Sequence, residues 1–102
     1  MACDTSFKTC SDARIELANS QQSRETVNLV PPGEDPSPDN LLAPGESRRI
    51  ELCLSKGDRR GFRVVRDGAT LATATCVASL ASYEPLVIRV GYGPGGISCE
   101  GW

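Results

Sequence analysis

Histidine is absent from the 102-residue chain, and aromatic residues make up only 5% of it. Without histidine the sequence cannot supply a Ser-His-Asp or a Cys-His catalytic arrangement. No glycine pattern typical of a phosphate-binding loop is present. Since no other spacing of acidic or nucleophilic residues indicates a catalytic site, we predict that the protein is not an enzyme and that it needs no cofactor.

The sequence also lacks long hydrophobic runs. No segment approaches the roughly 18 apolar residues of a membrane-spanning helix. The net charge of −2 provides no basic excess for bulk binding of nucleic acid. Glu34, Asp35 and Asp39 carry oxygens of the kind that Ca²⁺ prefers, but their order is not that of an EF-hand. We interpret these residues as a solvated acidic loop and predict no metal site.

Cysteine is plentiful for so short a chain, at positions Cys3, Cys10, Cys53, Cys76 and Cys99. No two cysteines are spaced as C-x-x-C, so a structural zinc site is disfavoured. Wide spacing in a small domain with few core rings indicates disulfides, which persist in oxidising compartments. We therefore expect an extracytoplasmic protein, either secreted, periplasmic or lipid-anchored; the alternative is a cytosolic protein with five buried thiols.

The odd number of cysteines leaves one without a partner in the chain, and Cys3 is the candidate. The other four allow three connectivities. Among these we favour Cys10–Cys99, which ties the two ends of the chain together. The remaining pair, Cys53–Cys76, would then close a loop of about 24 residues.

The dipeptide Ala2-Cys3 resembles the end of the cleavage motif of bacterial lipoproteins, in which the cysteine carries the lipid. The resemblance covers two residues and implies attachment to a membrane through Cys3 alone. Two other interpretations stay open, namely a free thiol at Cys3 and a Cys3–Cys10 bridge.

Alternating polar and apolar residues predict about seven short strands, with turns about ten residues apart. The expected strands cover residues 14–18, 26–30, 48–55, 62–66, 69–79, 86–92 and 97–102. This pattern is typical of an antiparallel two-sheet sandwich. We predict an all-β fold and a single domain over residues 1–102, with an irregular N-terminal segment at 1–10.

Three polar turns predict how consecutive strands are joined. The turns at 19–23 and 56–59 each suggest a hairpin between the strands on either side. Asp67-Gly68 is a strong signal for a two-residue type I′ turn, because that turn needs positive φ at both positions.

Prolines interrupt the strand pattern over residues 31–46, at Pro31, Pro32, Pro36, Pro38 and Pro44. Proline cannot donate to a strand ladder, so we predict a long loop that its prolines hold extended. Loops of this length inside small domains are usually functional or disordered.

The stretch Leu42-Ala43-Pro44-Gly45-Glu46-Ser47 resembles a turn found in bacterial extracytoplasmic immunoglobulin-like modules. The resemblance implies an immunoglobulin-like sandwich, and it concerns fold rather than function. The Cys…Trp…Cys order of antibody domains is missing, because Trp102 is the last residue. We expect Trp102 and Tyr92 to belong to the core; the alternative is an exposed aromatic pair.

Positive charge is concentrated in residues 48–66, which hold seven basic and two acidic residues. Its arginines are Arg48, Arg49, Arg59, Arg60, Arg63 and Arg66. If the two strands of this segment pair, several guanidinium groups share a surface that can bind carboxylate or phosphate. We predict a docking patch for a protein or another anionic surface; the alternative is a solvated face that discourages edge pairing.

These features together predict a non-catalytic extracytoplasmic module for binding or interaction. Two alternatives remain open. One is a small disulfide-stabilised inhibitor that presents the loop at 31–46 to an enzyme. The other is a structural or assembly subunit that forms a symmetric oligomer.

Overall fold

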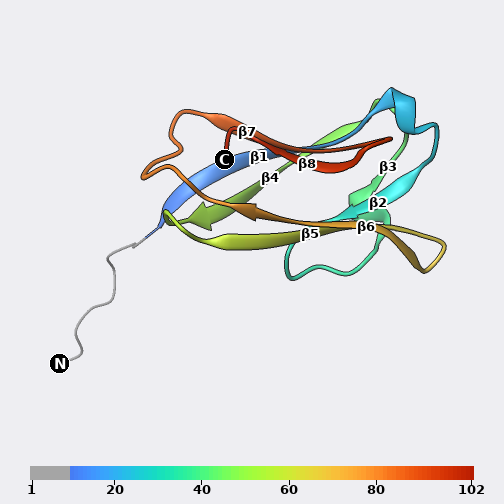
Figure 1. Ribbon diagram of the computed structural model, residues 1–102, viewed down its shortest axis with the longest axis horizontal. Helices are drawn as coiled ribbons and strands as arrows, with labels where there is room; N and C mark the ends of the chain where they lie inside the picture. The colour runs from blue at the N-terminus through green and yellow to red at the C-terminus, as the bar shows by residue number, and fades with distance from the viewer. Residues whose placement is uncertain (1–9) are drawn as a thin grey trace.

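The computed structural model describes residues 10–102, which form two four-stranded β-sheets packed face to face (Figure 1). Sheet A has the order β4-β1-β7-β8, with strands β1 (Ser11–Asn19), β4 (Ser47–Leu54), β7 (Val87–Gly93) and β8 (Gly96–Glu100). Sheet B has the order β3-β2-β5-β6, with strands β2 (Val27–Val30), β3 (Leu41–Leu42), β5 (Arg59–Arg66) and β6 (Ala69–Val77). The predicted all-β, two-sheet architecture is therefore confirmed.

Helical structure is limited to two 3₁₀ turns, η1 (Gln21–Ser23) and η2 (Pro38–Asn40), over residues 10–102. Neither is a helix of the length and apolar character that would let it cross a membrane. One strand pair departs from the expected antiparallel arrangement, because β1 and β7 run parallel. β1 is thus a central strand of sheet A, with β4 antiparallel on its other side.

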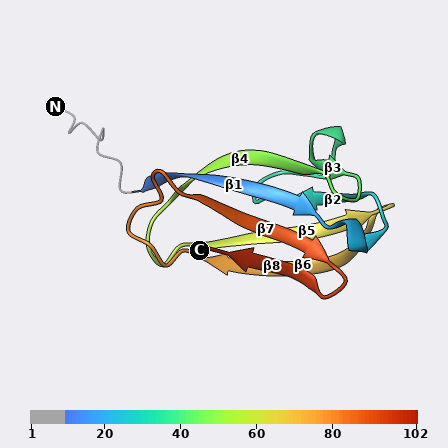
Figure 2. The same ribbon diagram turned by 90° about the horizontal axis from the view of Figure 1, so that it is seen from above.

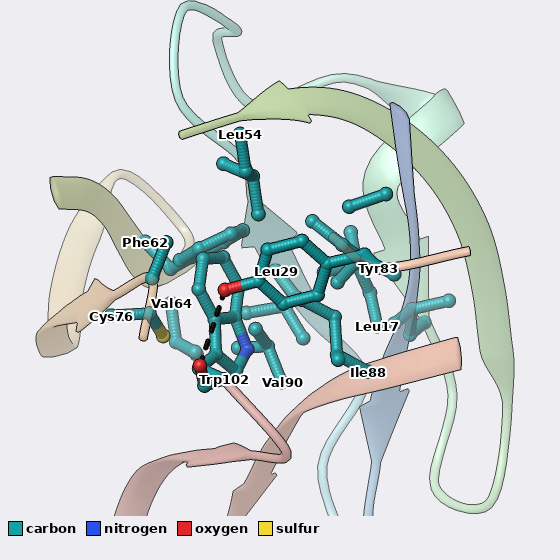
Figure 3. Packing of buried hydrophobic residues seen from close by; sticks show 14 of the residues in the cluster. Leu17, Leu29, Leu54, Phe62, Val64, Cys76, Tyr83, Ile88, Val90 and Trp102 are labelled. Carbon is teal, nitrogen blue, oxygen red and sulfur yellow. Dashed lines mark hydrogen bonds between the residues drawn. The ribbon is translucent and has the colours of Figure 1, made fainter. Parts of the chain in front are cut away.

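The core lies between the sheets and consists of the inward side chains of both (Figure 3). Ile15 and Leu17 of β1 and Val64 of β5 are fully buried, as strand alternation requires. Burying each such side chain contributes roughly 1.5–3 kcal/mol. Small residues fill the inner face of β6, where Cys76 is buried and Ala72 and Ala74 are half-buried.

Three aromatic residues close one end of the core. Trp102 meets Phe62 edge-on, with ring centroids 5.7 Å apart. The hydroxyl of Tyr83, which is fully buried, accepts a 3.2 Å hydrogen bond from the Leu80 amide and donates a 3.2 Å bond to the main-chain oxygen of Trp102 (Figure 3). The core interpretation of Trp102 is confirmed, although its ring partner is Phe62; Tyr92 is half-buried against the same cluster.

The expected hairpin between the first two strands is wrong, because β1 belongs to sheet A and β2 to sheet B. The buried side chain of Asn19 satisfies the polar groups where the chain crosses. Its amide nitrogen donates to the carbonyls of Glu25 (2.7 Å) and Leu42 (2.9 Å), and its oxygen accepts from the Ser23 hydroxyl (2.6 Å). The side-chain amide therefore replaces the ladder bonds that a hairpin would have supplied.

The turn predicted at 56–59 is present, but it too joins the two sheets. The Asp58 amide donates to the Ser55 carbonyl at 2.9 Å, while β4 lies in sheet A and β5 in sheet B. The Asp67-Gly68 hairpin is confirmed: both residues have positive φ, 51° and 79°, and they connect β5 to its neighbour β6.

The favoured disulfide pairing is wrong, although all four of those cysteines are bonded. The bridges are Cys10–Cys53 and Cys76–Cys99. Cys10 precedes β1 directly, and in the β1–β4 ladder Asp12 faces Cys53, which leaves the Cα atoms of Cys10 and Cys53 5.3 Å apart. Cys3 lies outside the described residues; because Cys10 is bonded to Cys53, the alternative Cys3–Cys10 bridge is excluded.

The second bridge joins the two sheets along one side. Cys76 of β6 and Cys99 of β8 have Cα atoms 5.7 Å apart, and Figure 2 shows β6 and β8 on the same side of the molecule. β6 is the last strand of sheet B and β8 the last of sheet A. The bridge therefore holds two edge strands next to each other.

Candidate binding cleft on the outer face of sheet B

A cleft of about 600 Å³ opens on the outer face of sheet B, where β2 stops early. β2 ends at Val30, which faces Arg63 of β5. Pro31 and Pro32 follow, and neither can donate to the ladder. The chain turns back at this point, with the Glu34 amide bonded to the Pro31 carbonyl at 3.2 Å, and the loop projects outward from sheet B (Figure 1).

The floor of the cleft is formed by β5 and β6. Gly61 faces Thr75 across the two strands, and Arg63 faces Thr73. A side chain built at Gly61 would find no atom within 4 Å of its Cβ, so the glycine leaves real space there. The floor therefore offers two hydroxyl groups and an open stretch of main chain.

The wall of the cleft is a loop held in a fixed shape by Asn40, whose side chain is completely buried. Its oxygen accepts from the Asn28 amide group (2.8 Å) and from the Ser37 main chain (3.2 Å). Its nitrogen donates to the Asp35 carbonyl at 2.9 Å. The segment predicted as a loop at 31–46 thus contains η2 and β3, and asparagine bonding stiffens it in addition to its prolines.

The acidic residues of this loop are not simply solvated. The Glu34 carboxylate lies 3.5 Å from the Arg48 guanidinium, and the Asp35 carboxylate lies 3.8 Å from that of Arg63. Arg63 also donates to the Glu34 carbonyl at 3.4 Å. Among the described residues no group of three potential ligands is placed to hold a metal ion.

The six arginines of the basic segment do not form one patch, because β4 and β5 lie in different sheets. Arg49 lies on β4 in sheet A, whereas Arg48 reaches across to Glu34. Arg60 lies 3.3 Å from Asp58, and Arg66 lies 2.6 Å from Glu25.

Two of the six arginines, Arg59 and Arg63, alternate onto the outer face of sheet B; Arg63 lines the cleft, and Arg59 lies outside its lining. Arg59 and Arg63 are on either side of Gly61, and their positions along the strand are about 13 Å apart at the usual rise per residue. Arg59 is exposed and has no ion pair within residues 10–102. The structure thus places one cation in the cleft, at Arg63, and a second on the same face of β5 on the other side of Gly61.

Sequence reasoning singled out Arg59, Arg63 and the proline loop, but it did not single out Gly61. A glycine inside a strand often marks a close approach of another backbone or a ligand, and that signal was present in the sequence. No protein-family model, curated protein or solved structure matches the chain.

Proposed function

We propose that the protein is a non-catalytic extracytoplasmic binding module with an immunoglobulin-like sandwich, and that its cleft holds an extended acidic segment of a partner protein. The observation that carries this proposal is the arrangement of Arg59 and Arg63 around the open floor at Gly61. The two disulfides support an oxidising compartment.

An extended segment suits the shape of the floor. Two carboxylates four residues apart on an extended chain are separated by about 13 Å, which matches the spacing of Arg59 and Arg63. The main chain between them can lie over Gly61, within reach of the Thr73 and Thr75 hydroxyls.

Arg63 is available to such a ligand because its present contacts, with the Asp35 carboxylate and the Glu34 carbonyl, are both long. The Asp35 side chain is 99% exposed and 3.8 Å away, and exposed pairs of this kind contribute little. A carboxylate inside the cleft can form a bidentate pair with the same guanidinium, which is a stronger contact.

The proposal is tested by calorimetric titration with a synthetic peptide of about eight residues that carries two glutamates four positions apart. We expect binding at low salt that weakens at high salt, and no binding of the peptide with glutamine in both positions. Arg63→Ser is expected to weaken binding roughly tenfold, the usual loss for a charged hydrogen bond. Arg49→Ser removes the same charge from sheet A and is expected to have no effect.

Filling the cleft supplies a second test that leaves the charges unchanged. Gly61→Phe is expected to abolish binding and to keep the fold, since the added side chain meets no neighbouring atom at its Cβ. Gly95→Phe, in the β7–β8 turn, is the matched control, because its Cβ is also unobstructed. Equal affinity for both peptides, or an unchanged affinity of Arg63→Ser and Gly61→Phe, contradicts the proposal.

The stiffness of the loop favours the inhibitor as a second candidate. Asn40 fixes the loop from within while Gly33, Glu34 and Asp35 remain exposed at its tip. The two functions separate at Gly61→Phe: an inhibitor that presents the loop tip keeps its activity in this variant, whereas the binding module loses its ligand.

A further inference from the structure

The four edge strands of the two sheets differ in how they are protected. β3 has only two residues and β8 only five, and β4 carries Arg49 and Glu51 on its outer side. β6 is nine residues long and contains no charged residue and no proline. Native edge strands are normally short, charged or interrupted, because open ladder groups pair with other chains. β6 has no charge and no proline, and its pairing with β5 is interrupted only near its N-terminal end, where the register shifts between Val64 and Val65 and passes over Leu71.

The side of β6 away from β5 has no ladder partner within residues 10–102, although β8 lies close to it at Cys76. The ladder partner of β6 in the described part of the chain is β5, on one side only. On its outer face Leu71 is 40% exposed and Val77 45% exposed, and Thr73 and Thr75 between them are exposed as well. The Cys76–Cys99 bridge holds the strand in place, which lowers the entropy cost of pairing it with a partner.

We propose that two copies of the chain pair antiparallel through β6, with Ala74 on the two-fold axis. In that register Thr73 faces Thr75 of the other copy, and Val77 lies opposite Leu71, the residue that the β5–β6 pairing passes over at its register shift. Apolar and threonine pairs of this kind stabilise neighbouring strands, and every pair occurs twice by symmetry. The outer face of β6 is therefore complementary to itself.

A second copy fits this edge better than an unrelated strand. The sequence from residue 68 to residue 83 has no charged side chain, so the pairing of two copies brings no like charges together. The result joins the two B sheets into one continuous sheet, which removes both open edges at once.

The dimer has a consequence for the cleft, and this consequence alone rests on the proposed function. Thr73 and Thr75 line the cleft and also lie next to the two-fold axis. The two β5 strands then lie three strand spacings apart, about 14 Å. Both clefts open on the same outer surface, which suits a partner that presents two acidic segments.

The test measures molar mass by light scattering and sedimentation from micromolar to millimolar protein. We expect a dimer for the unaltered chain and a monomer for Thr73→Lys. In a dimer of this variant the two new ammonium groups would lie near each other across the axis, and each would face only the uncharged hydroxyl of Thr75. Thr26→Lys, on an exposed segment before β2, is the matched control and is expected to stay dimeric. Circular dichroism confirms that each variant is folded.

The register is tested by restoring the pairing with a second charge. In Thr73→Lys/Thr75→Glu each new ammonium faces a new carboxylate of the other copy, so the dimer is expected to return and to be sensitive to salt. A monomeric unaltered chain, a Thr73→Lys variant that is still dimeric, or a double variant that stays monomeric overturns the proposal. None of these results depends on ligand binding in the cleft, which the peptide titration tests separately.

Discussion

The outer surfaces of the two sheets satisfy their polar groups in different ways. On sheet A, Arg89 lies between two carboxylates, 3.4 Å from Glu16 and 3.9 Å from Glu100. On sheet B, Gly61 of β5 forms an uncharged surface with Thr73 and Thr75 of the edge strand β6, which carries no charge. Sheet A thus neutralises its charges internally, whereas sheet B leaves hydroxyls and a ladder edge available. This difference is the basis of our proposal that sheet B is the side on which the protein meets its partners.

Removing the bridge at the edge of sheet B is expected to have the largest combined effect on stability and assembly. Cys76→Ala/Cys99→Ala opens a loop of about 24 residues and should lower the free energy of unfolding by about 3 kcal/mol. Because the bridge also holds β6 beside β8, we expect the dimer to weaken as well. Urea denaturation and light scattering measure the two quantities.

The other bridge provides the control for that experiment. Cys10→Ala/Cys53→Ala opens a longer loop and should cost about 4 kcal/mol, but it touches only β1 and β4 of sheet A. We expect this variant to keep its dimer at temperatures where it is folded. Equal loss of the dimer in both variants would show that the edge of β6 has no special role.

A smaller effect is expected when sheet A is made to resemble sheet B. Arg49→Thr/Glu51→Thr removes the charges from the outer side of β4, with a change in stability of about 0.5 kcal/mol or less. If charge is what protects this edge, the variant gains a second pairing surface and grows into assemblies larger than a dimer. Sedimentation velocity checks this, and a variant that behaves like the unaltered chain would argue that charge does not protect β4.

The strands themselves could be predicted, because alternation along the chain shows directly which side of each strand is buried. In β4 the sequence placed Ile50, Leu52 and Leu54 on one face, and these are the side chains turned toward the core. The type I′ turn at Asp67-Gly68 was predictable for a similar local reason, since few residue pairs accept positive φ.

The connections between strands could not be predicted in this way. A turn that joins paired strands and a turn that crosses between sheets have the same polar composition. At 19–26 the crossing is decided by the buried contacts of Asn19 with Glu25 and Leu42, the second of which is 23 residues away. The disulfide pairing follows from these crossings, so it was wrong for the same reason.

Only part of the candidate site could be predicted from the sequence. The proline loop and the basic segment were both singled out, but their meeting depends on the early end of β2 and on its pairing with β5. Arg48 and Arg60 already form ion pairs within the molecule. Arg48 pairs with Glu34 of the proline loop, and Arg60 pairs with Asp58 of the preceding turn. Only the three-dimensional arrangement puts Arg63 in the cleft and leaves Arg59 unpaired on the same face of β5 within the described residues.

The most direct test of sheet B as the interaction side is a map of amide chemical shifts of the unaltered, isotope-labelled protein. Spectra are compared between dilute and concentrated samples, and then with and without the acidic peptide. Concentration is predicted to shift the amides of β6, and the peptide those around Gly61, while β1 and β4 stay constant. Shifts confined to β1 and β4, or no shifts in either series, would contradict it.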